Sequence, residues 1–282
     1  MDKNKQQIIM PGLYLVSTPI GNMEDITIRA LNILKKSDII LCEDTRHSGK
    51  LLFSFQIKSK LLSYHKFNEN KVSHKIINFL KEGKIISLIS DAGTPTISDP
   101  GMILVNKCIE ENLNIYPIPG PSAVTSALSV SGFDGRFIFY GFLAKKEKEL
   151  ENIFKSLSGL DYSIIFFIPG IKINSYIKQF KKFFFDRKIL IAKEITKIHE
   201  KFIRSNIDTI EDLKGNLKGE FTVVLSPKIT RKKNKNEINE SVKIEIKEMF
   251  KRYRIKEVVE FISKKENLSK KIIYNFCLKL KK

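Results

Sequence analysis

One acidic turn stands out in a chain that is otherwise strongly basic. Residues 90–101, "SDAGTPTISDPG", hold two aspartates and no lysine or arginine, whereas the whole chain has 50 Lys and Arg against 31 Asp and Glu. A pocket built from this turn would repel a triphosphate and would favour a ligand that carries hydroxyls, amines or positive charge. Gly93 would let the backbone approach that ligand closely. The turn therefore predicts a binding site for a cationic or hydroxyl-bearing molecule.

S-adenosyl-L-methionine has the groups that such a pocket would recognise. Its sulfonium and ammonium are positive, its ribose carries hydroxyls, and carboxylates accept hydrogen bonds from hydroxyls and amines. The glycine-rich cradles of dinucleotides and triphosphates, G-x-G-x-x-G and G-x-x-x-x-G-K-[ST], are missing from the sequence. The end of the turn has a simpler interpretation, because Asp99 followed by Pro100 is typical of the first residues of a helix. Pro121 and Ser122 could begin another helix in the same way.

A second group of side chains could act on a substrate. The stretch "EDTRH", residues 43–47, brings two carboxylates, an arginine and a histidine together. Glu43 or Asp44 could take a proton from a hydroxyl; Arg46 could bind a phosphate; His47 could serve as a base or stack on a nucleobase. Structural alternatives stay open, since Asp44 could cap the helix that begins near Arg46 and a single histidine more often packs or faces solvent.

These stretches follow predicted strands in an alternating α/β pattern. Short β-branched runs predict strands at 12–17, 38–43, 60–65, 84–90 and 114–119. Apolar residues at helical spacing predict helices at 26–37, 43–55, 68–83 and 99–112. Asn68 stands where an N-cap belongs, and Gly83 follows as the C′ residue. The pattern indicates a parallel sheet covered on both faces, with ligands bound at the carboxyl ends of its strands.

A second α/β segment begins near residue 120. Its predicted strands are 136–142, 161–169, 187–195 and 219–227, and its predicted helices include 146–159 and 174–184. Lys193 and Glu194, at the end of one strand, are further site candidates, although an ion pair or a role in the fold explains them about as well. The predicted domains are 1–120 and 121–227, followed by a basic linker at 228–241 and a basic helical appendage at 242–282.

The positive charge is distributed unevenly along the chain. Residues 1–120 hold 15 basic and 12 acidic residues, a balance of +3, whereas residues 121–282 hold 35 and 19, a balance of +16. Such asymmetry favours RNA or DNA as a partner, because Lys and Arg release counterions condensed on phosphates. The alternative is a compositional bias toward Lys, Ile, Asn and Phe, as an A+T-rich coding sequence would produce.

Composition also disfavours several classes of protein. No run approaches the roughly 18 uninterrupted apolar residues of a membrane helix, and "MDKNKQQIIMPG" lacks the features of a signal or transit peptide. We therefore expect a soluble, cytoplasmic protein with no membrane partner. Cys42, Cys108 and Cys277 are odd in number and widely separated, which predicts reduced thiols. The four histidines form no H-x-x-x-H pair, so no metal is expected.

Four stretches together resemble a known family. They are "TPIGNMEDIT", "EDTRHSGKLL", "SDAGTPTISDPG" and "PGPSAVTSAL", and in this order they are similar to successive motifs of the ribosomal RNA small subunit methyltransferase I family, which is tetrapyrrole-methylase-like. "AKEITKIHE", "KGEFTVVL" and the tail around "LSKKIIYNF" agree, so the resemblance spans nearly the whole chain. It implies two αβ domains of the tetrapyrrole methylase type with the cofactor between them, plus a small C-terminal helical appendage. It also implies a homodimeric cytoplasmic enzyme that uses S-adenosylmethionine to methylate the 2′-hydroxyl of a cytidine in the decoding region of 16S ribosomal RNA.

The candidate site residues follow from the motifs. The cofactor contacts implied by the resemblance are Pro19, Asp91, Gly93, Thr94, Ser122 and Ala123. The catalytic candidates are Asp44, Glu43 and Lys193, and the substrate-binding candidates are Asn22, Arg46 and His47. One stretch departs from the family, which usually reads close to F-Y-E-S-P-H-R where this chain has "FFIPGIK". Ile168, Ile171 and Lys172 stand at the positions of Glu, His and Arg and are therefore left out of the site.

Two other functions are compatible with parts of the sequence. A tetrapyrrole C-methyltransferase would use the same cofactor, but a small macrocycle needs neither "EDTRHSGK" nor the basic helical tail. A non-catalytic RNA-binding or assembly protein that retains the fold is supported by "FFIPGIK". The intact "SDAGTP" and "PGPSA" argue against that second alternative.

Overall fold

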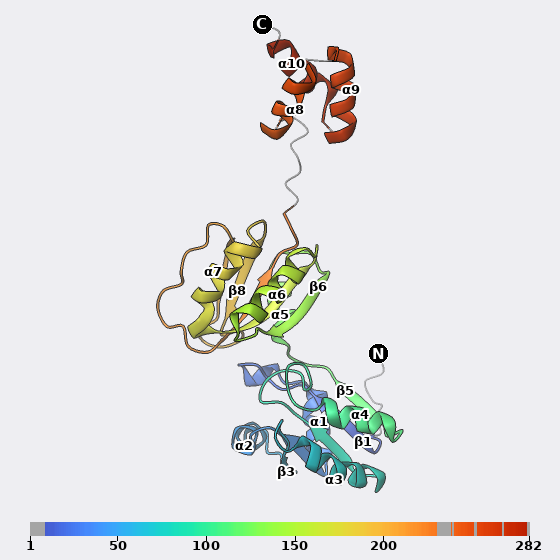
Figure 1. Cartoon of the computed structure of the whole chain (residues 1–282). Helices are drawn as coiled ribbons and strands as arrows, with labels where there is room; N and C mark the ends of the chain where they lie inside the picture. Colours follow the sequence, from blue (N-terminus) through green and yellow to red (C-terminus); the bar gives the residue numbers. More distant parts are fainter. Residues whose placement is uncertain (1–8, 230–237, 239, 251–252, 267, 281–282) are drawn as a thin grey trace. The chain divides into compact units, whose positions relative to one another are not determined.

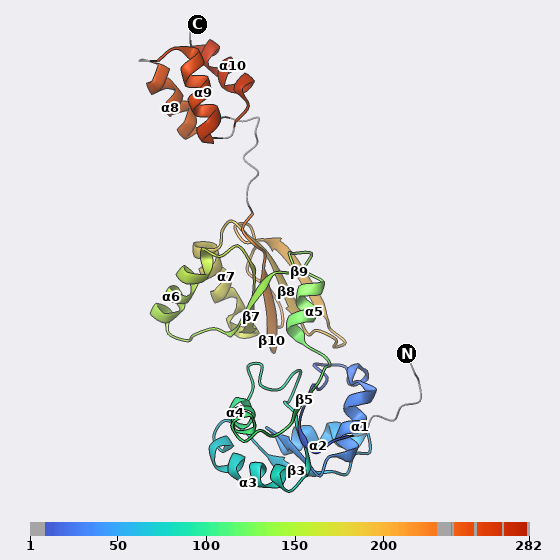
Figure 2. The same cartoon turned by 90° about the vertical axis from the view of Figure 1, so that its right-hand side faces the viewer.

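The computed structural model describes residues 9–229, 238, 240–250, 253–266 and 268–280 (Figures 1 and 2). These residues belong to two compact units, one ending at Lys228 and one beginning at Ile229. The predicted linker, 228–241, lies for the most part outside the described residues. No helix within the described ranges is both long enough and apolar enough to cross a membrane.

Five parallel strands form the first sheet of the larger unit, in the order β3-β2-β4-β1-β5. The strands are β1 (Gly12–Val16), β2 (Ile39–Cys42), β3 (Lys60–Ser63), β4 (Ile85–Leu88) and β5 (Ile115–Ile118). The sequence predicts all five, and the prediction of a parallel sheet is confirmed. Because the strands are parallel, the loops that follow β1, β2, β4 and β5 all leave the same edge of the sheet.

Helices cover both faces of this sheet, as predicted (Figure 2). They are α1 (Ile28–Lys36), α2 (Thr45–Ser54), α3 (Glu69–Lys81) and α4 (Met102–Glu110). Successive residues of a strand point to opposite faces. Ile40 therefore packs with α1 and α2, and Leu41 packs with α3 and α4. The two apolar layers explain why these strands are apolar at nearly every position.

The helix caps agree only in part with the sequence patterns. Asp44 is the N-cap of α2, and its carboxylate accepts a hydrogen bond from the backbone N–H of Arg46 at 2.8 Å. The structural alternative for Asp44 is therefore confirmed. Asn68 is at the N-cap position of α3 but makes no side-chain bond to that helix. Ser122 is at the N-cap position of α5 (Ala123–Ser129), also without a side-chain cap bond.

The prediction that Asp99 and Pro100 begin a helix is wrong. Helix α4 begins at Met102, and its N-cap position is taken by Gly101, with φ of 131°. Thr96 and Ser98 also have positive φ, of 71° and 70°. The chain therefore turns once more before the helix starts, and the aspartate is left in the turn instead of at the helix end.

The second sheet of the larger unit is mixed. Its order is β6-β7-β10-β8-β9, in which β6 and β7 are parallel and the other neighbours are antiparallel. The strands are β6 (Phe137–Phe142), β7 (Ser163–Pro169), β8 (Lys188–Lys193), β9 (Lys201–Asn206) and β10 (Glu220–Leu225). Helices α6 (Glu147–Ser158) and α7 (Ile173–Phe183) pack on one face and α5 on the other (Figure 2).

A buried arginine fastens the second sheet to the loops beside it. The Arg187 side chain is 0% exposed, and its guanidinium donates hydrogen bonds to the backbone oxygens of Tyr162, Ser226, Ser158 and Leu160. Burial lowers the pKa of Arg187. Buried charge is tolerated only when it is well hydrogen-bonded, so these carbonyl oxygens are what makes the buried guanidinium possible.

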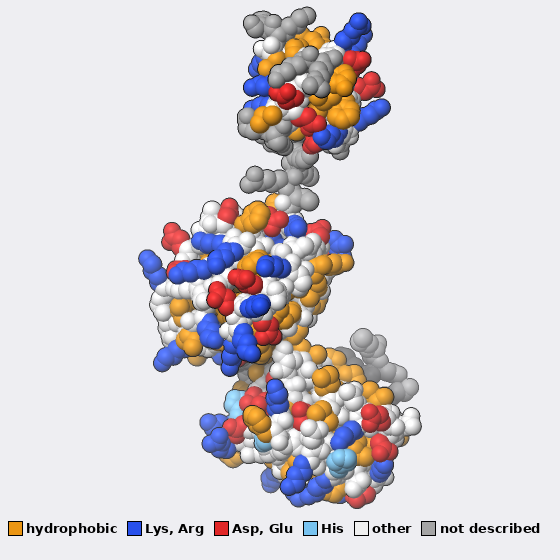
Figure 3. Space-filling view, viewed as in Figure 1, with side chains coloured by type: hydrophobic (Ala, Val, Ile, Leu, Met, Phe, Trp, Pro, Cys, Tyr) orange, Lys and Arg blue, Asp and Glu red, His pale blue; other side chains and the backbone are white. Residues whose placement is uncertain are grey.

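The smaller unit is a three-helix cluster, in agreement with the predicted appendage. It contains α8 (Glu240–Phe250), α9 (Ile255–Glu266) and α10 (Lys270–Leu280). Ile246, Val258, Ile262 and Ile273 lie at the centre of its own apolar core. On the faces drawn in Figure 3, Lys and Arg side chains are spread over both units and interspersed with Asp and Glu.

Candidate active site

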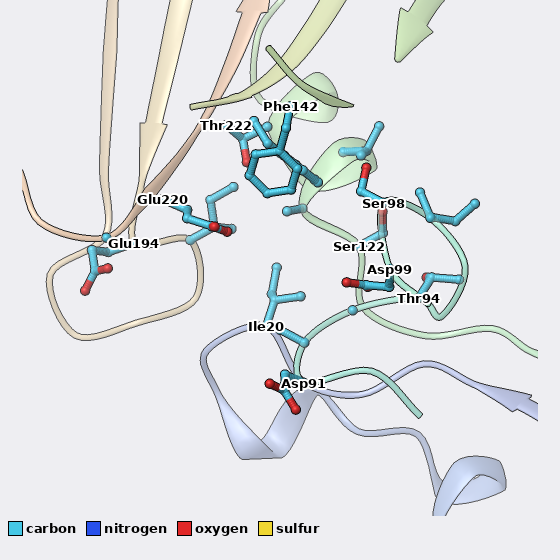
Figure 4. Close-up of a pocket in the computed structure, with 18 of the residues that line it drawn as sticks. Ile20, Asp91, Thr94, Ser98, Asp99, Ser122, Phe142, Glu194, Glu220 and Thr222 are labelled. Atoms are coloured by element: carbon cyan, nitrogen blue, oxygen red, sulfur yellow. The ribbon is translucent and has the colours of Figure 1, made fainter. Parts of the chain in front are cut away.

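A cavity of about 520 Å³ lies in the larger unit where the loops of the first sheet face the second sheet (Figure 4). From the first part of the chain it is lined by Ile20, Glu43, Asp91, Ala92, Gly93, Thr94, Ile97, Ser98 and Asp99, and from α5 by Ser122, Ala123 and Val124. The second sheet contributes Phe142, Phe167, Glu194, Ile195, Lys197, Gly219, Glu220 and Thr222. We call this space the acidic cavity. Its position at the carboxyl ends of parallel strands is the one the sequence predicts.

Backbone pairing holds the acidic turn against the end of β1. Thr18 and Gly93 exchange two hydrogen bonds, with N···O distances of 2.9 and 3.1 Å. The Thr18 hydroxyl donates to the Ser90 backbone oxygen at 3.1 Å, and the hydroxyls of Ser17 and Thr94 lie 3.0 Å apart. Gly93 has a φ of 79°, a conformation that costs glycine little. The turn is therefore a fixed wall of the cavity.

Strained backbone is concentrated in the loops that line the cavity. Thr96, Ser98, Glu194 and Thr196 all have positive φ, between 54° and 71°. Such conformations cost on the order of 1–3 kcal/mol each, and they are genuine outliers for β-branched threonine. The Thr196 hydroxyl accepts a hydrogen bond from the backbone N–H of Asn22 at 3.0 Å. Strain of this kind is held in place by its surroundings and clusters at functional sites.

Strand β6 of the second sheet lies close to the acidic turn beside Ser98. Strand β6 has an irregularity between Phe139 and Gly141, and Gly141 has a φ of 85°. A Cβ atom on Gly141 would lie 2.9 Å from the Ser98 hydroxyl oxygen. The glycine therefore allows the second sheet to close over the acidic turn.

The lining is strongly acidic. Glu43, Asp91, Asp99, Glu194 and Glu220 contribute five carboxylates, whereas Lys197 is the one basic residue among the described lining residues. The Lys197 ammonium is paired with Glu194 at 3.1 Å. In a chain of net charge +19, such a cavity favours a cationic ligand, because like charges in a partly desolvated space repel one another.

Two carboxyl groups of the cavity have raised pKa values. Burial, followed by the negative charge of Glu43, raises the pKa of Asp99 to about 6, against the opposing effect of a hydrogen bond from Ser90. Partial burial and the charge of Asp91 raise the pKa of Glu43. Asp99 can therefore change protonation state not far below neutral pH, and the raised pKa of Glu43 makes it a stronger base than an ordinary carboxylate.

Six of the predicted site residues line the acidic cavity. They are Glu43, Asp91, Gly93, Thr94, Ser122 and Ala123. Pro19 does not line the cavity, although it lies between Thr18, which is hydrogen-bonded to the acidic turn, and Ile20, which lines the cavity. Asn22 binds the loop after β8 through its backbone, while its side chain accepts a hydrogen bond from the Glu24 backbone N–H at 3.1 Å.

Three other predicted residues lie at an adjoining opening. Asp44 and Arg46 line a second cavity of about 480 Å³, which shares Glu43 and Asp91 with the acidic cavity. His47 reaches the same wall, because its Nε2 lies 3.2 Å from the Asp91 backbone oxygen. The pKa of Asp44 is lowered to about 2 by its hydrogen bonds to the Arg46 side chain and backbone. A carboxylate of such low pKa is a weak base.

Lys193 is not brought to the acidic cavity. It lines a third cavity of about 270 Å³ with Lys201, Lys214 and Phe221. Along β8, Ile191 packs in the core beneath α6 and α7, and Ala192 packs on the opposite face. Because side chains alternate along a strand, Lys193 points to the same face as Ile191, away from the α5 face on which the acidic cavity opens.

Within "FFIPGIK", the three residues that were left out of the site, Ile168, Ile171 and Lys172, do not line the acidic cavity. Ile168 is fully buried in the core beneath α6 and α7, whereas Ile171 and Lys172 are exposed. Its neighbour Phe167 points to the other face and lines the acidic cavity. The loss of the family's Glu, His and Arg at these three positions therefore removes no side chain from the walls that the structure shows.

Sequence reasoning missed several residues that the structure brings to the cavity. Asp99 belongs to the acidic turn, but the sequence pattern does not place it in the site, because Asp followed by Pro is typical of a helix start. Glu194 was a candidate only beside Lys193. Glu220 and Phe142 had no signal, because their position depends on how the second sheet faces the first.

Known proteins are similar to this chain over most of its length. A sequence profile of the Tetrapyrrole (Corrin/Porphyrin) Methylases matches residues 12–211. Proteins named "Ribosomal RNA small subunit methyltransferase I" are 46% identical in Mesomycoplasma conjunctivae, over 82% of this chain and 98% of that protein, and 45% identical in Thermotoga maritima, over 78% and 100%. The protein of that name in Neisseria meningitidis serogroup B is 34% identical over 100% of this chain and 98% of its own length.

Solved structures share the fold at low sequence identity. Diphthine synthase matches with a TM-score of 0.57 and 15% identity, over 76% of this chain and 89% of that one. Uroporphyrin-III-C-methyltransferase from Thermus thermophilus matches with a TM-score of 0.55 and 15% identity, over 77% and 94%. These likenesses concern the fold alone, whereas the sequence relatives are close enough to define the family. The chain therefore belongs to the tetrapyrrole methylases and, within them, to the ribosomal RNA small subunit methyltransferase I family.

Proposed function

We propose that this protein uses S-adenosylmethionine to methylate the 2′-hydroxyl of a cytidine in the decoding region of 16S ribosomal RNA, acting as a homodimer in the cytoplasm. The observation that carries the proposal is the acidic cavity, whose five carboxylates suit a cationic methyl donor in a protein that is otherwise basic. The names of its relatives support small-subunit ribosomal RNA as the acceptor.

The residues of the acidic cavity fit S-adenosylmethionine. Its volume lies within the roughly 300–1,000 Å³ of small-molecule sites. Asp91 and Asp99 would face the positive groups and the ribose hydroxyls, and Ser122 offers a further hydroxyl. Phe142 and Phe167 supply an aromatic wall for the adenine. When bound, S-adenosylmethionine supplies a methyl group that its positively charged sulfur has already activated.

The chain itself has to position the acceptor hydroxyl and take its proton. Glu43 is the better base of the two neighbouring carboxylates, because its pKa is raised whereas that of Asp44 is lowered to about 2. Glu43 also lines both the acidic cavity and the second cavity. Orientation of well-placed reactants contributes up to about 7–11 kcal/mol to such a reaction, so fixed loops matter at least as much as the base.

Transfer of a labelled methyl group to purified small subunits tests the proposal. The subunits are taken from a strain that lacks the modification, and the labelled RNA is digested to nucleosides. We expect label in 2′-O-methylcytidine and saturable binding of S-adenosylmethionine by calorimetry. Binding of S-adenosylmethionine without transfer to RNA would favour a non-catalytic RNA-binding or assembly protein. Transfer to a tetrapyrrole instead of RNA would favour a tetrapyrrole C-methyltransferase.

A further inference from the structure

The second cavity adjoins the acidic cavity across a shared wall. Glu43 and Asp91 line both spaces, so a group bound in one lies next to a group bound in the other. The remaining lining of the second cavity comes from the start of α2 and from the loop between β3 and α3. Its chemistry differs from that of the acidic cavity, because it includes Arg46, Lys66, His65 and Phe67.

Phe67 is an aromatic ring held out in solvent at this cavity. Its side chain is 94% exposed, although it packs edge-on against His65 with 6.0 Å between ring centroids. Because apolar side chains stabilise proteins by burial, such an exposed ring contributes little to the stability of the fold. Exposed aromatic rings beside cations are the usual stacking surface for unpaired nucleobases.

The loop that carries Phe67 is rigidly fixed. The Asn68 side chain accepts a hydrogen bond from the His65 backbone N–H at 2.9 Å and donates one to the Ser63 backbone oxygen at 3.1 Å. The Phe67 backbone N–H lies 3.2 Å from His65 Nδ1. This is why Asn68 stands at the N-cap position of α3 without bonding to the helix. A fixed platform loses little conformational entropy when a ligand stacks on it.

Two cations complete the cavity on the solvent side. The Asp44 carboxylate accepts hydrogen bonds from Nε and Nη2 of Arg46, at 3.2 and 3.0 Å, and so orients the guanidinium. The Arg46 side chain is still 89% exposed. Lys66 is exposed beside Phe67. Cations at the opening, an aromatic platform and carboxylates at the inner wall match a nucleotide with its phosphate outward and its ribose inward.

We propose that the second cavity holds the acceptor nucleotide of a single-stranded RNA segment, with its base stacked on Phe67, its phosphate at Arg46 and Lys66, and its ribose hydroxyl at Glu43. The inference rests on the proposed function, since the two cavities share Glu43 and Asp91 and the acceptor hydroxyl would then lie next to the methyl donor. It assigns to Phe67 the role of a positioning residue, which orients the acceptor without taking part in the chemistry.

Fluorescence measures the stacking directly, because the chain contains no tryptophan. Phe67→Trp introduces a single fluorophore at the cavity, and Phe53→Trp is the matched control, since Phe53 is 85% exposed and does not line this cavity. The probes are a single-stranded RNA with the decoding-region sequence and the same RNA with an abasic site at the target cytidine. We expect the intact RNA to quench Phe67→Trp strongly, the abasic RNA to quench it weakly, and neither to quench Phe53→Trp. Equal quenching by both RNAs, or no quenching by either, would overturn the inference.

Kinetics on small subunits provide the second readout. Phe67→Ala is expected to lower kcat/KM for RNA by about 5- to 150-fold, the worth of one base–aromatic stack, without changing the affinity for S-adenosylmethionine. Phe67→Tyr should restore the rate, and Phe53→Ala should leave it unchanged. Wild-type rates for Phe67→Ala would refute the inference while leaving the proposed function intact. An inactive wild-type protein that still shows base-dependent quenching would instead refute the proposed function alone.

Discussion

Neutralising Asp99 is expected to stabilise the fold and to weaken the binding of a cationic ligand. Burial and the charge of Glu43 raise the pKa of the Asp99 carboxyl from its ordinary value of 3.8 to about 6. The folded protein therefore holds this carboxyl in its charged form at a cost. Asp99→Asn keeps the shape of the side chain and removes the charge.

The size of the effect follows from the two pKa values. One unit of pKa corresponds to about 1.4 kcal/mol, so a rise from 3.8 to about 6 costs the ionised wild type at most about 3 kcal/mol, and nearer 1 kcal/mol if water in the open cavity screens the charges. Between these pH values the folded state binds more protons than the unfolded state, so this contribution to stability falls as pH rises. Below pH 3.8 the cost is absent, and above pH 6 it is complete.

Paired thermal melts of wild type and Asp99→Asn test this reasoning. For a unit of this size about 1 kcal/mol corresponds to roughly 2–4 °C in Tm, so the variant should melt about 2–12 °C higher at pH 7.5 and the gap should narrow toward pH 5. Asp134→Asn is the control, because hydrogen bonds from Arg136 lower the pKa of Asp134, and its neutralisation should not stabilise. A destabilised Asp99→Asn protein, or a difference in Tm that does not depend on pH, would show that the ionised Asp99 carboxylate does not destabilise the fold.

Calorimetry with S-adenosylmethionine measures the functional side of the same change. The cation pairs with the ionised carboxylate, so wild-type affinity is expected to fall as pH drops below about 6, whereas Asp99→Asn should bind more weakly at pH 7.5 and should lack that pH dependence. Equal affinity of both proteins at pH 7.5 would show that Asp99 does not face the positive charge of the ligand.

Three further predictions concern other named residues. Arg187→Leu leaves several buried carbonyl oxygens without their donor, and we expect a loss of about 3–5 kcal/mol in the free energy of unfolding; denaturant titration showing less than about 1 kcal/mol would contradict this account of the buried guanidinium. Glu43→Gln is expected to lower kcat by about 10²- to 10⁴-fold with little change in S-adenosylmethionine affinity, whereas Asp44→Asn, which can still cap α2, should reduce kcat far less; the reverse order in single-turnover assays would make Asp44 the base. Lys193→Gln should leave kcat within about twofold of wild type because its side chain points away from the acidic cavity, and a large loss in the same assay would return it to the catalytic candidates.

The elements of the first sheet were predictable because their signal is local. Strands such as β2 and β4 are apolar at nearly every position, since helices cover both faces. Strand β9 was not predicted, because it is an edge strand with many exposed side chains. Residues 201–206 form a strand because they pair with β8. The apolar and polar pattern of these residues does not reveal that pairing.

The site was predictable where a motif forms a loop by itself. Asp91 and Gly93 belong to a turn whose composition already indicates a ligand, and they line the cavity. Asp99 was misassigned because the Asp-Pro pattern is typical of helix starts, while the positive φ values of Thr96 and Ser98 that displace it depend on tertiary contacts. Lys193 does lie at the end of a strand, as predicted. The face of the sheet to which its side chain points depends on the pairing of β8 with β9 and β10, which the sequence pattern does not show.

Cytidine 2′-O-methylation by this protein is tested by the methylation state of small-subunit RNA from a strain that lacks this modification and expresses the protein. Mass spectrometry of RNA fragments from the decoding region is expected to show one 2′-O-methylcytidine with the wild-type chain and a far smaller modified fraction with Glu43→Gln. A methyl group on a base, a methyl group elsewhere in the RNA, or unmodified RNA from cells that contain the folded wild-type protein would contradict the account.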